Sequence, residues 1–164
     1  MHIITARAVA IGALAAAATY LCLGTPLGLQ VWALFIGWGS FYHTGGKTDG
    51  LTKSAVNHAW GAAIAAITLI VVGTVGGSVL VTSLIVGASV VVLVLGAHLP
   101  IFATIPAGVY GYASTAAFCL LTGVAIADPA ATIKAAAVVL VSLVVGNIFG
   151  LVSEKIGGAL AAKS

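Results

Sequence analysis

Three histidines have the widest chemical range of any side chains in this sequence. His43, His58 and His98 each lie near the end of a long apolar segment. An imidazole titrates near neutral pH and commonly ligates metals, so three of them at one mouth of a bundle could line a vestibule, sense protons or bind a metal. A metal site needs a closer set of ligands, and Asp49 is the only carboxylate near them in the sequence. We therefore expect neither a metal nor a cofactor. Independent interfacial histidines are the alternative to a shared vestibule.

The most polar segment, residues 42–58, joins two apolar runs and carries two of these histidines. Its Gly-Gly-Lys-Thr core is similar to the end of a phosphate-binding loop, but that motif needs a glycine where Phe41 stands and a strand before it. We interpret the segment as a solvated loop with flexible glycines. We place three of its polar residues at the cytoplasmic mouth beside the histidines: Lys47, Asp49 and Asn57.

A stripe of small and polar residues recurs at helical spacing in the apolar run 101–123, where it would follow one helix face. Pro100 and Pro106 bracket the start of that run and predict a broken or re-entrant entry. Polar groups inside a membrane usually face the bundle interior. From the stripe and the one deep amide we predict five path-lining residues: Thr104, Gly108, Tyr112, Thr115 and Asn147. Ordinary hydrogen bonding between helices is the alternative.

The composition decides which solvent surrounds these residues. The chain is 62% hydrophobic and 5% charged, whereas soluble domains carry about 25% charged residues. Such a chain needs the lipid bilayer as its solvent. The net charge of +3 comes without a basic stripe or interleaved aromatic residues, so nucleic acid is not an expected partner.

Six apolar stretches predict an all-α, polytopic membrane protein with six transmembrane helices in a single domain, residues 1–164. The predicted spans are approximately 8–24, 27–43, 55–75, 78–97, 101–123 and 135–153. The break at 76–78 is short enough to imply a tight helical hairpin. With the N-terminus inside, five Lys and Arg residues fall in inner segments and only Lys134 falls outside. This bias predicts a bacterial inner-membrane protein with both termini in the cytoplasm.

The two halves of the chain share a weak pattern. Gly24, Trp38 and Gly39 match Gly96, Tyr110 and Gly111 at one constant offset. This alignment fits a 3+3 inverted repeat, as in many channels and transporters, and fits equally a chance match of Gly and Ala in a chain of low diversity. Small-xxx-small patterns, such as the one from Gly146 to Gly150, predict close helix packing. We expect a homo-oligomer.

The layout and the aromatic and glycine residues from Trp38 to Tyr42 and from Asn57 to Gly61 resemble a family of uncharacterised bacterial six-span inner-membrane proteins, the YcdZ-like family. A fainter similarity links Trp60-Gly61-Ala-Ala and Gly73-Thr-Val-Gly-Gly to the membrane halves of fusaric-acid-resistance-type exporters. The first resemblance implies the fold but no substrate or catalytic residue. This chain lacks the large cytoplasmic domain of the exporters.

The predicted spans contain no Asp, Glu, Lys or Arg, which disfavours transport coupled to protons or sodium. No nucleophile–base arrangement is present, so we do not expect an enzyme. The leading hypothesis is a passive channel or facilitator for a small neutral or weakly anionic solute. The main alternative is a non-transporting membrane anchor or accessory subunit for a partner protein. A histidine-based metal or proton sensor is a third hypothesis.

Overall fold

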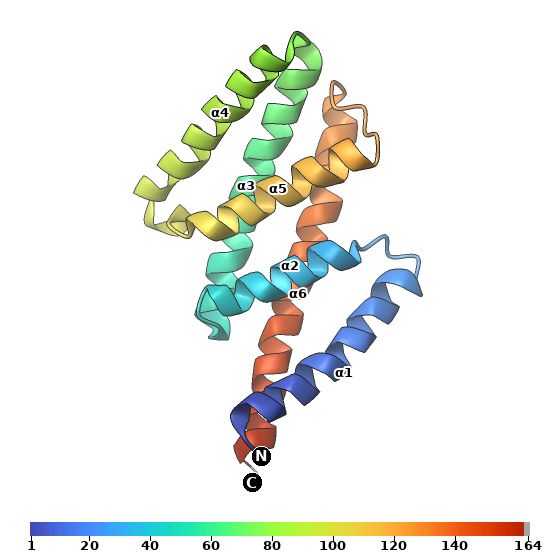
Figure 1. Cartoon of the computed structure of the whole chain (residues 1–164), viewed down its shortest axis with the longest axis vertical. Coiled ribbons are helices and arrows are strands. Elements are labelled where there is room, and N and C mark those ends of the chain that lie inside the picture. Colours follow the sequence, from blue (N-terminus) through green and yellow to red (C-terminus); the bar gives the residue numbers. More distant parts are fainter. Residues whose placement is uncertain (163–164) are drawn as a thin grey trace.

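The fold is entirely helical over the part of the chain that the structure describes. The structure is a computed structural model that describes residues 1–162 (Figure 1). These residues form α1 (Ile3–Leu23), α2 (Val31–His43), α3 (Lys47–Val75), α4 (Val79–Leu95), the 3-10 turns η1 (Gly96–His98) and η2 (Pro100–Phe102), α5 (Ile105–Leu121) and α6 (Pro129–Ala162). The prediction of an all-α protein is confirmed.

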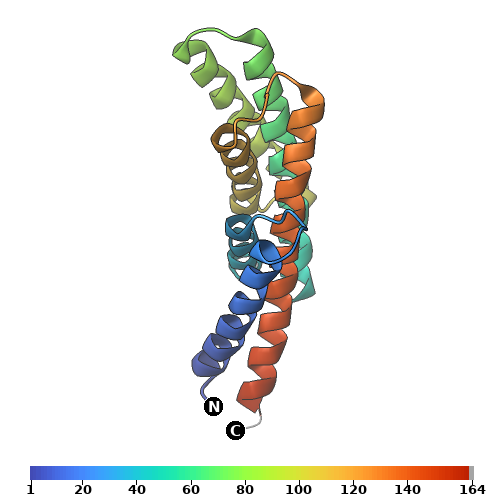
Figure 2. The ribbon, with the colours of Figure 1, turned by 90° about the vertical axis from the view of Figure 1, so that its right-hand side faces the viewer.

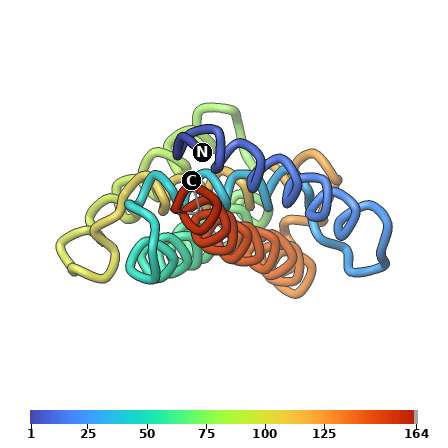
Figure 3. The backbone as a smooth tube through the Cα atoms, turned by 90° about the horizontal axis from the view of Figure 1, so that it is seen from below, coloured from blue at the N-terminus to red at the C-terminus, as the bar shows by residue number. Residues whose placement is uncertain are grey.

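The two longest helices, α3 and α6, form the centre of the molecule. They lie in contact and run in opposite directions (Figure 1). The short helix α2 packs across α6, and the short helix α5 packs across α3. Figure 2 shows α3 and α6 in one layer, with α1, α2 and α5 in a second. Seen from below, the two termini lie close together at one end (Figure 3). Each half of the chain therefore places its short helix on the long helix of the other half.

The connection between α3 and α4 is the tight hairpin that the sequence predicts. Gly76 and Gly77 have φ angles of 61° and 112°, in the left-handed region that favours glycine. Ser78 then caps α4, because its side chain accepts a hydrogen bond from the Val81 backbone N–H at 3.4 Å. The chain reverses within three residues.

The prediction of a solvated loop before the third helix is wrong for most of its length, because α3 begins at Lys47. A carboxylate from the far end of the chain caps this helix: Glu154 of α6 accepts a hydrogen bond from the Lys47 backbone N–H at 2.8 Å. Asp49 and Lys53 form an exposed ion pair at 2.6 Å one turn apart on α3. Charged residues that resemble a loop in the sequence thus form the first turns of a helix.

Four helical segments are long and apolar enough to cross a membrane: α1, α3, residues 79–98 and α6. The helix α2 has 13 residues. At 1.5 Å per residue it is about 20 Å long, shorter than a hydrocarbon core of about 30 Å. The helix α5 has 17 residues. Residues 1–162 thus contain six helices, of which four are long and apolar enough to span a membrane, and the predicted six spans are not confirmed.

The outer helix α4 shows what kind of solvent the fold requires. An 18-residue window within residues 79–98 has a mean hydropathy of 2.7, yet only 6% of that window is buried inside the molecule. Val79, Leu84 and Leu95 are among many large apolar side chains that are exposed. Water would not tolerate a contiguous apolar face of this kind. Its apolar helices make the chain compatible with a membrane protein.

Candidate functional site

The first short helix crosses α6 at two glycines. A Cβ atom on Gly37 of α2 would overlap the backbone carbonyl of Leu143, and one on Gly146 of α6 would overlap the carbonyl of Leu34. The two backbones therefore touch directly, as small residues permit in membrane helices. The predicted close packing at Gly146 and Gly150 is confirmed, since Gly150 lies against the ring of Phe41.

The second short helix crosses α3 in the same way. A Cβ atom on Gly61 of α3 would overlap the backbone carbonyl of Gly108, and one on Gly111 of α5 would overlap the carbonyl of His58. Each crossing thus joins one short helix to one long helix through a glycine on both sides. We call these contacts the α2/α6 crossing and the α5/α3 crossing.

The two crossings are related by constant offsets in the sequence. Each residue of α2 that makes the first crossing has a counterpart in α5, 74 positions later, that makes the same contact in the second crossing. The counterparts are Leu34 and Gly108, Gly37 and Gly111, and Trp38 and Tyr112. Likewise, each residue of α3 that makes the second crossing has its counterpart in α6, 85 positions later, in the first. The counterparts are His58 and Leu143, and Gly61 and Gly146. We call this pair of offsets the crossing register.

The alignment made from sequence differs from the crossing register. It paired Trp38 with Tyr110, 72 positions on, whereas the residue that takes the place of Trp38 in the second crossing is Tyr112. The backbone N–H groups of Trp38 and Tyr112 are the atoms that face Gly146 and Gly61. The sequence alignment is therefore two residues out of step in the short helices.

The predicted path-lining stripe on α5 lies on the face that packs against α3. Gly108 is at the crossing, and Thr115 is fully buried. Further along that face, Cys119 packs with Leu69 of α3. Thr104 is the N-cap residue of α5. The stripe is thus a helix–helix contact, and the surface of α5 that lines a pocket is a different one.

Another predicted path residue belongs to a buried polar cluster of Ser40, Ser54, His58 and Asn147, the Ser–His–Asn cluster. Each of these four side chains is at most 1% exposed. The Ser40 and Ser54 hydroxyls lie 2.6 Å apart, and His58 Nε2 lies 3.0 Å from Ser40 Oγ. Asn147 Nδ2 lies 3.4 Å from His58 Nδ1. Three helices, α2, α3 and α6, thus share one hydrogen-bonded network in the core.

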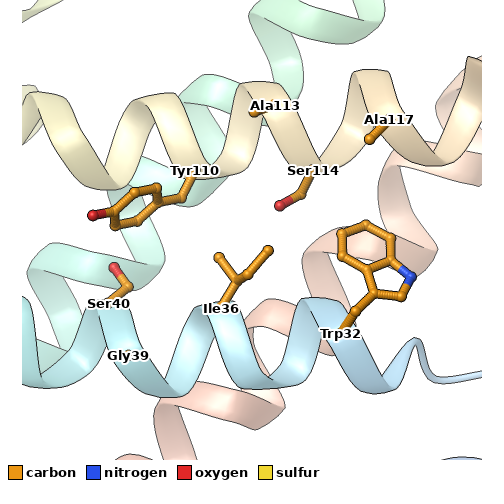
Figure 4. Close-up of a pocket in the computed structure, with 8 residues that line it drawn as sticks. All are labelled: Trp32, Ile36, Gly39, Ser40, Tyr110, Ala113, Ser114 and Ala117. Atoms are coloured by element: carbon orange, nitrogen blue, oxygen red, sulfur yellow. The ribbon is translucent and has the colours of Figure 1, made fainter.

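The helices α2 and α5 line an open pocket of about 600 Å³ between them. Its lining residues are drawn in Figure 4: Trp32, Ile36, Gly39, Ser40, Tyr110, Ala113, Ser114 and Ala117. In the crossing register, Ile36 corresponds to Tyr110, and Gly39 and Ser40 correspond to Ala113 and Ser114. Six of the eight lining residues are thus three matched pairs, so the pocket lies where the two halves face each other.

The polar groups of the pocket are few and uncharged. The hydroxyls of Ser40 and Ser114 project between the two helices (Figure 4). The Ser40 hydroxyl belongs to the Ser–His–Asn cluster, whereas the Ser114 hydroxyl is buried and has no hydrogen-bond partner within residues 1–162. Tyr110 also bonds outside the pocket: its hydroxyl lies 3.0 Å from Nδ1 of His43, an exposed residue at the end of α2. The site can hold an uncharged molecule of moderate size.

The other predicted mouth residues do not gather around this pocket. Lys47 and Asp49 are exposed on α3. Asn57 is buried and donates from Nδ2 to the backbone oxygens of Lys53 at 2.8 Å and Ile101 at 3.2 Å. His98 is exposed in η1. Across residues 1–162, no three His, Cys, Asp or Glu side chains form a group that could hold a metal ion.

Sequence reasoning did not select Trp32, Ser40 or Ser114 for the site. A single serine in an apolar helix carries little information, because serines there commonly bond to their own helix backbone. One signal was present: Ser40 and Ser114 are separated by the same 74 positions as Gly37 and Gly111. A search for pairs at one offset would have found them.

Comparison with known proteins places the chain in a family. The family described as "Protein of unknown function (DUF1097)" matches residues 8–158. No curated protein and no solved structure matches the chain. The closer resemblances, to YcdZ-like proteins and to fusaric-acid-resistance-type exporters, therefore remain predictions. Because the match covers almost the whole sequence, the chain belongs to the DUF1097 family of proteins of unknown function.

Proposed function

We propose that the protein is a passive membrane facilitator that takes a small uncharged solute through the pocket between α2 and α5. The observation that carries the proposal is the lining of that pocket. It combines three residue pairs matched in the crossing register with hydroxyls as its inward polar groups. The predicted stripe of α5 packs against α3. We therefore assign the solute path to the opposite face of α5, which lines the pocket.

The crossing register supports the 3+3 inverted repeat that this proposal includes. In such repeats, solute sites lie at the interface of the two halves, often beside short or broken helices. Here α2 has 13 residues and α5 has 17, and α5 follows two 3-10 turns, the second of which begins at Pro100. The matched pocket residues come from these two helices alone.

The arrangement of cations supports a cytoplasmic location for both termini in a bacterial inner membrane. Arg7 lies near the start of α1, Lys47 at the start of α3 and Lys155 near the end of α6. These helix ends lie toward one end of the molecule, whereas Lys134 lies near the start of α6 at the other (Figure 1). An excess of Lys and Arg marks the cytoplasmic side of membrane proteins.

Solute flux tests the proposal directly. Proteoliposomes with wild-type protein are mixed with urea, glycerol, 1,2-propanediol or butyramide, and swelling is followed by stopped-flow light scattering. A Cβ atom on Gly39 would meet no atom of residues 1–162 within 4 Å, so Gly39→Leu places a side chain in the pocket without a backbone clash. We expect this variant to lose most of the protein-dependent flux of at least one solute.

The matched control is Gly87→Leu on α4. This glycine is also helical and also has no neighbour within 4 Å in the described chain, but it lies outside the pocket. It should retain wild-type flux. Equal rates in wild-type and protein-free liposomes for every solute, or equal loss in both variants, would contradict the facilitator. Co-purification of one partner protein by such an inactive chain would then support the accessory-subunit alternative.

A further inference from the structure

The two serines of the pocket differ in one respect that the crossing register explains. Ser40 and Ser114 take equivalent places on α2 and α5, and both are almost completely buried, at 1% and 3% exposure. The Ser40 hydroxyl bonds to Ser54 and His58 of α3. The Ser114 hydroxyl has no partner in the described residues. The hydroxyl on the α2 side of the pocket thus has hydrogen-bond partners within the protein, and the hydroxyl on the α5 side has none among the described residues.

The cause lies in the residues of α6 that correspond to the partners of Ser40. Adding 85 positions to Ser54 and His58 gives Val139 and Leu143, two apolar and fully buried residues. Val139 packs in the core with Phe118, which lies one helical turn after Ser114. In a symmetric molecule Val139 and Leu143 would hydrogen-bond to the Ser114 hydroxyl, but their side chains have no polar atoms.

A buried hydroxyl without a partner is less stable than one that is hydrogen-bonded, because its desolvation is not compensated. A bound molecule that hydrogen-bonds to it would recover this free energy. The rest of the lining determines the rest of that molecule. It is apolar and carries two aromatic rings, Trp32 and Tyr110, and no charged side chain lines it. A carboxylate or ammonium group would lose its hydration there without an opposite charge in return.

We infer that Ser114 is the polar anchor of a binding site for an uncharged molecule with an apolar body and a single hydrogen-bonding group. A volume of about 600 Å³ lies within the range of pockets that hold small molecules. This inference rests on the proposed function and narrows its uncharged solute to compounds with an apolar body and one hydrogen-bonding group. A lipid acyl chain is the competing occupant, and it would make no use of the Ser114 hydroxyl.

The test compares three probes that share one ring system: 2-naphthalenemethanol, 2-methylnaphthalene and 2-naphthoate. Binding is measured by isothermal titration calorimetry on the full chain in lipid nanodiscs, with protein-free nanodiscs as the blank. Wild-type protein should bind the alcohol about tenfold more tightly than the hydrocarbon, as expected for one buried hydrogen bond, and the carboxylate most weakly. Ser114→Ala should abolish the preference for the alcohol and leave the hydrocarbon affinity unchanged.

A second variant tests the explanation without removing any residue of the pocket. Val139→Ser gives Ser114 the kind of partner that Ser54 gives Ser40, so it should also weaken alcohol binding several-fold. Val139→Ala is its control, because it removes side-chain volume without adding a hydroxyl, and it should keep the preference.

Equal affinities of wild-type protein for alcohol and hydrocarbon, as an acyl-chain site would give, overturn the inference, and so does an alcohol affinity that Ser114→Ala leaves unchanged. Preferential binding of the alcohol together with absent solute flux would instead uphold the site and reject the facilitator. The two proposals therefore fail in different experiments.

Discussion

The α2/α6 and α5/α3 crossings use the same backbone contact with different chemistry around it. In both, a glycine of a short helix meets the carbonyl of a long-helix residue, which is Leu143 in one case and His58 in the other. His58 brings a hydrogen-bonded cluster into the core, whereas Leu143 packs with Ala33 and Val139. Close helix approach therefore depends on the glycines, and the polar content of each half varies independently of it.

The glycines at the crossings should give the largest effect when they are changed. Gly61→Ala and Gly146→Ala each place a Cβ atom on a backbone carbonyl that no side-chain rotation can move away. We expect each to destabilise the protein by about 3 kcal/mol or more, measured by unfolding in mixed detergent micelles. Similar losses at the two sites would support equivalent crossings, and a loss at only one site would break the comparison.

Gly87→Ala supplies the matched control for those variants. It lies within α4, and an added Cβ atom would have no neighbour within 4 Å in the described residues. Replacing a glycine inside a helix by alanine favours the helix by up to about 1 kcal/mol. This variant should therefore unfold at the wild-type detergent fraction or slightly above it.

His58→Leu should give an intermediate effect, because it makes the α5/α3 crossing resemble the other. Ser40 and Asn147 would lose a buried partner, at a cost of about 1–3 kcal/mol. Asn147→Leu added to His58→Leu should cost less than Asn147→Leu alone, since its partner is already absent. Additive losses in this double-mutant cycle, measured by the same unfolding assay, would show that the Asn147–His58 contact is not energetically coupled.

The smallest effect is expected where the two crossings carry corresponding aromatic residues. Tyr112 bonds through its hydroxyl to Ser89 of α4 at 2.8 Å, while Trp38 donates from Nε1 to Ser153 of α6 at 3.0 Å. Tyr112→Phe should cost about 0.6 kcal/mol, typical of a hydrogen bond between membrane helices. Ser89→Ala should reproduce that loss, and the double variant should add little to it. Independent losses would exclude a bond between the two hydroxyls.

The helices were predictable because apolar runs interrupted by Gly and Pro determine where a membrane helix can form. Their ends were not, because distant residues set them. The backbone N–H of Gln30, before α2, donates to the Ser142 hydroxyl of α6 at 2.9 Å, and the start of α3 depends on Glu154. Local sequence contains neither contact. The predicted second span therefore came out too long, and α3 was expected to begin too late.

The site was less predictable than the fold. The spacing of Thr104, Gly108 and Thr115 correctly indicated one helix face, but spacing cannot tell whether a face meets a path or another helix. Here the small residues allow α3 to approach, so the face is closed. Asn147 was correctly expected inside the bundle, and it is fully buried, although in the Ser–His–Asn cluster rather than at the pocket.

The exchange of short helices between the two halves also determines when the fold can form. The helix α2 packs mainly on α6, which is synthesised after the other five helices, and Glu154 completes the start of α3 from that same helix. The surface of α2 that packs on α6 therefore stays uncovered until α6 has been synthesised. Two fragments divided at Gly76 and Gly77 should each be incomplete alone and should assemble into the native bundle when they are produced together.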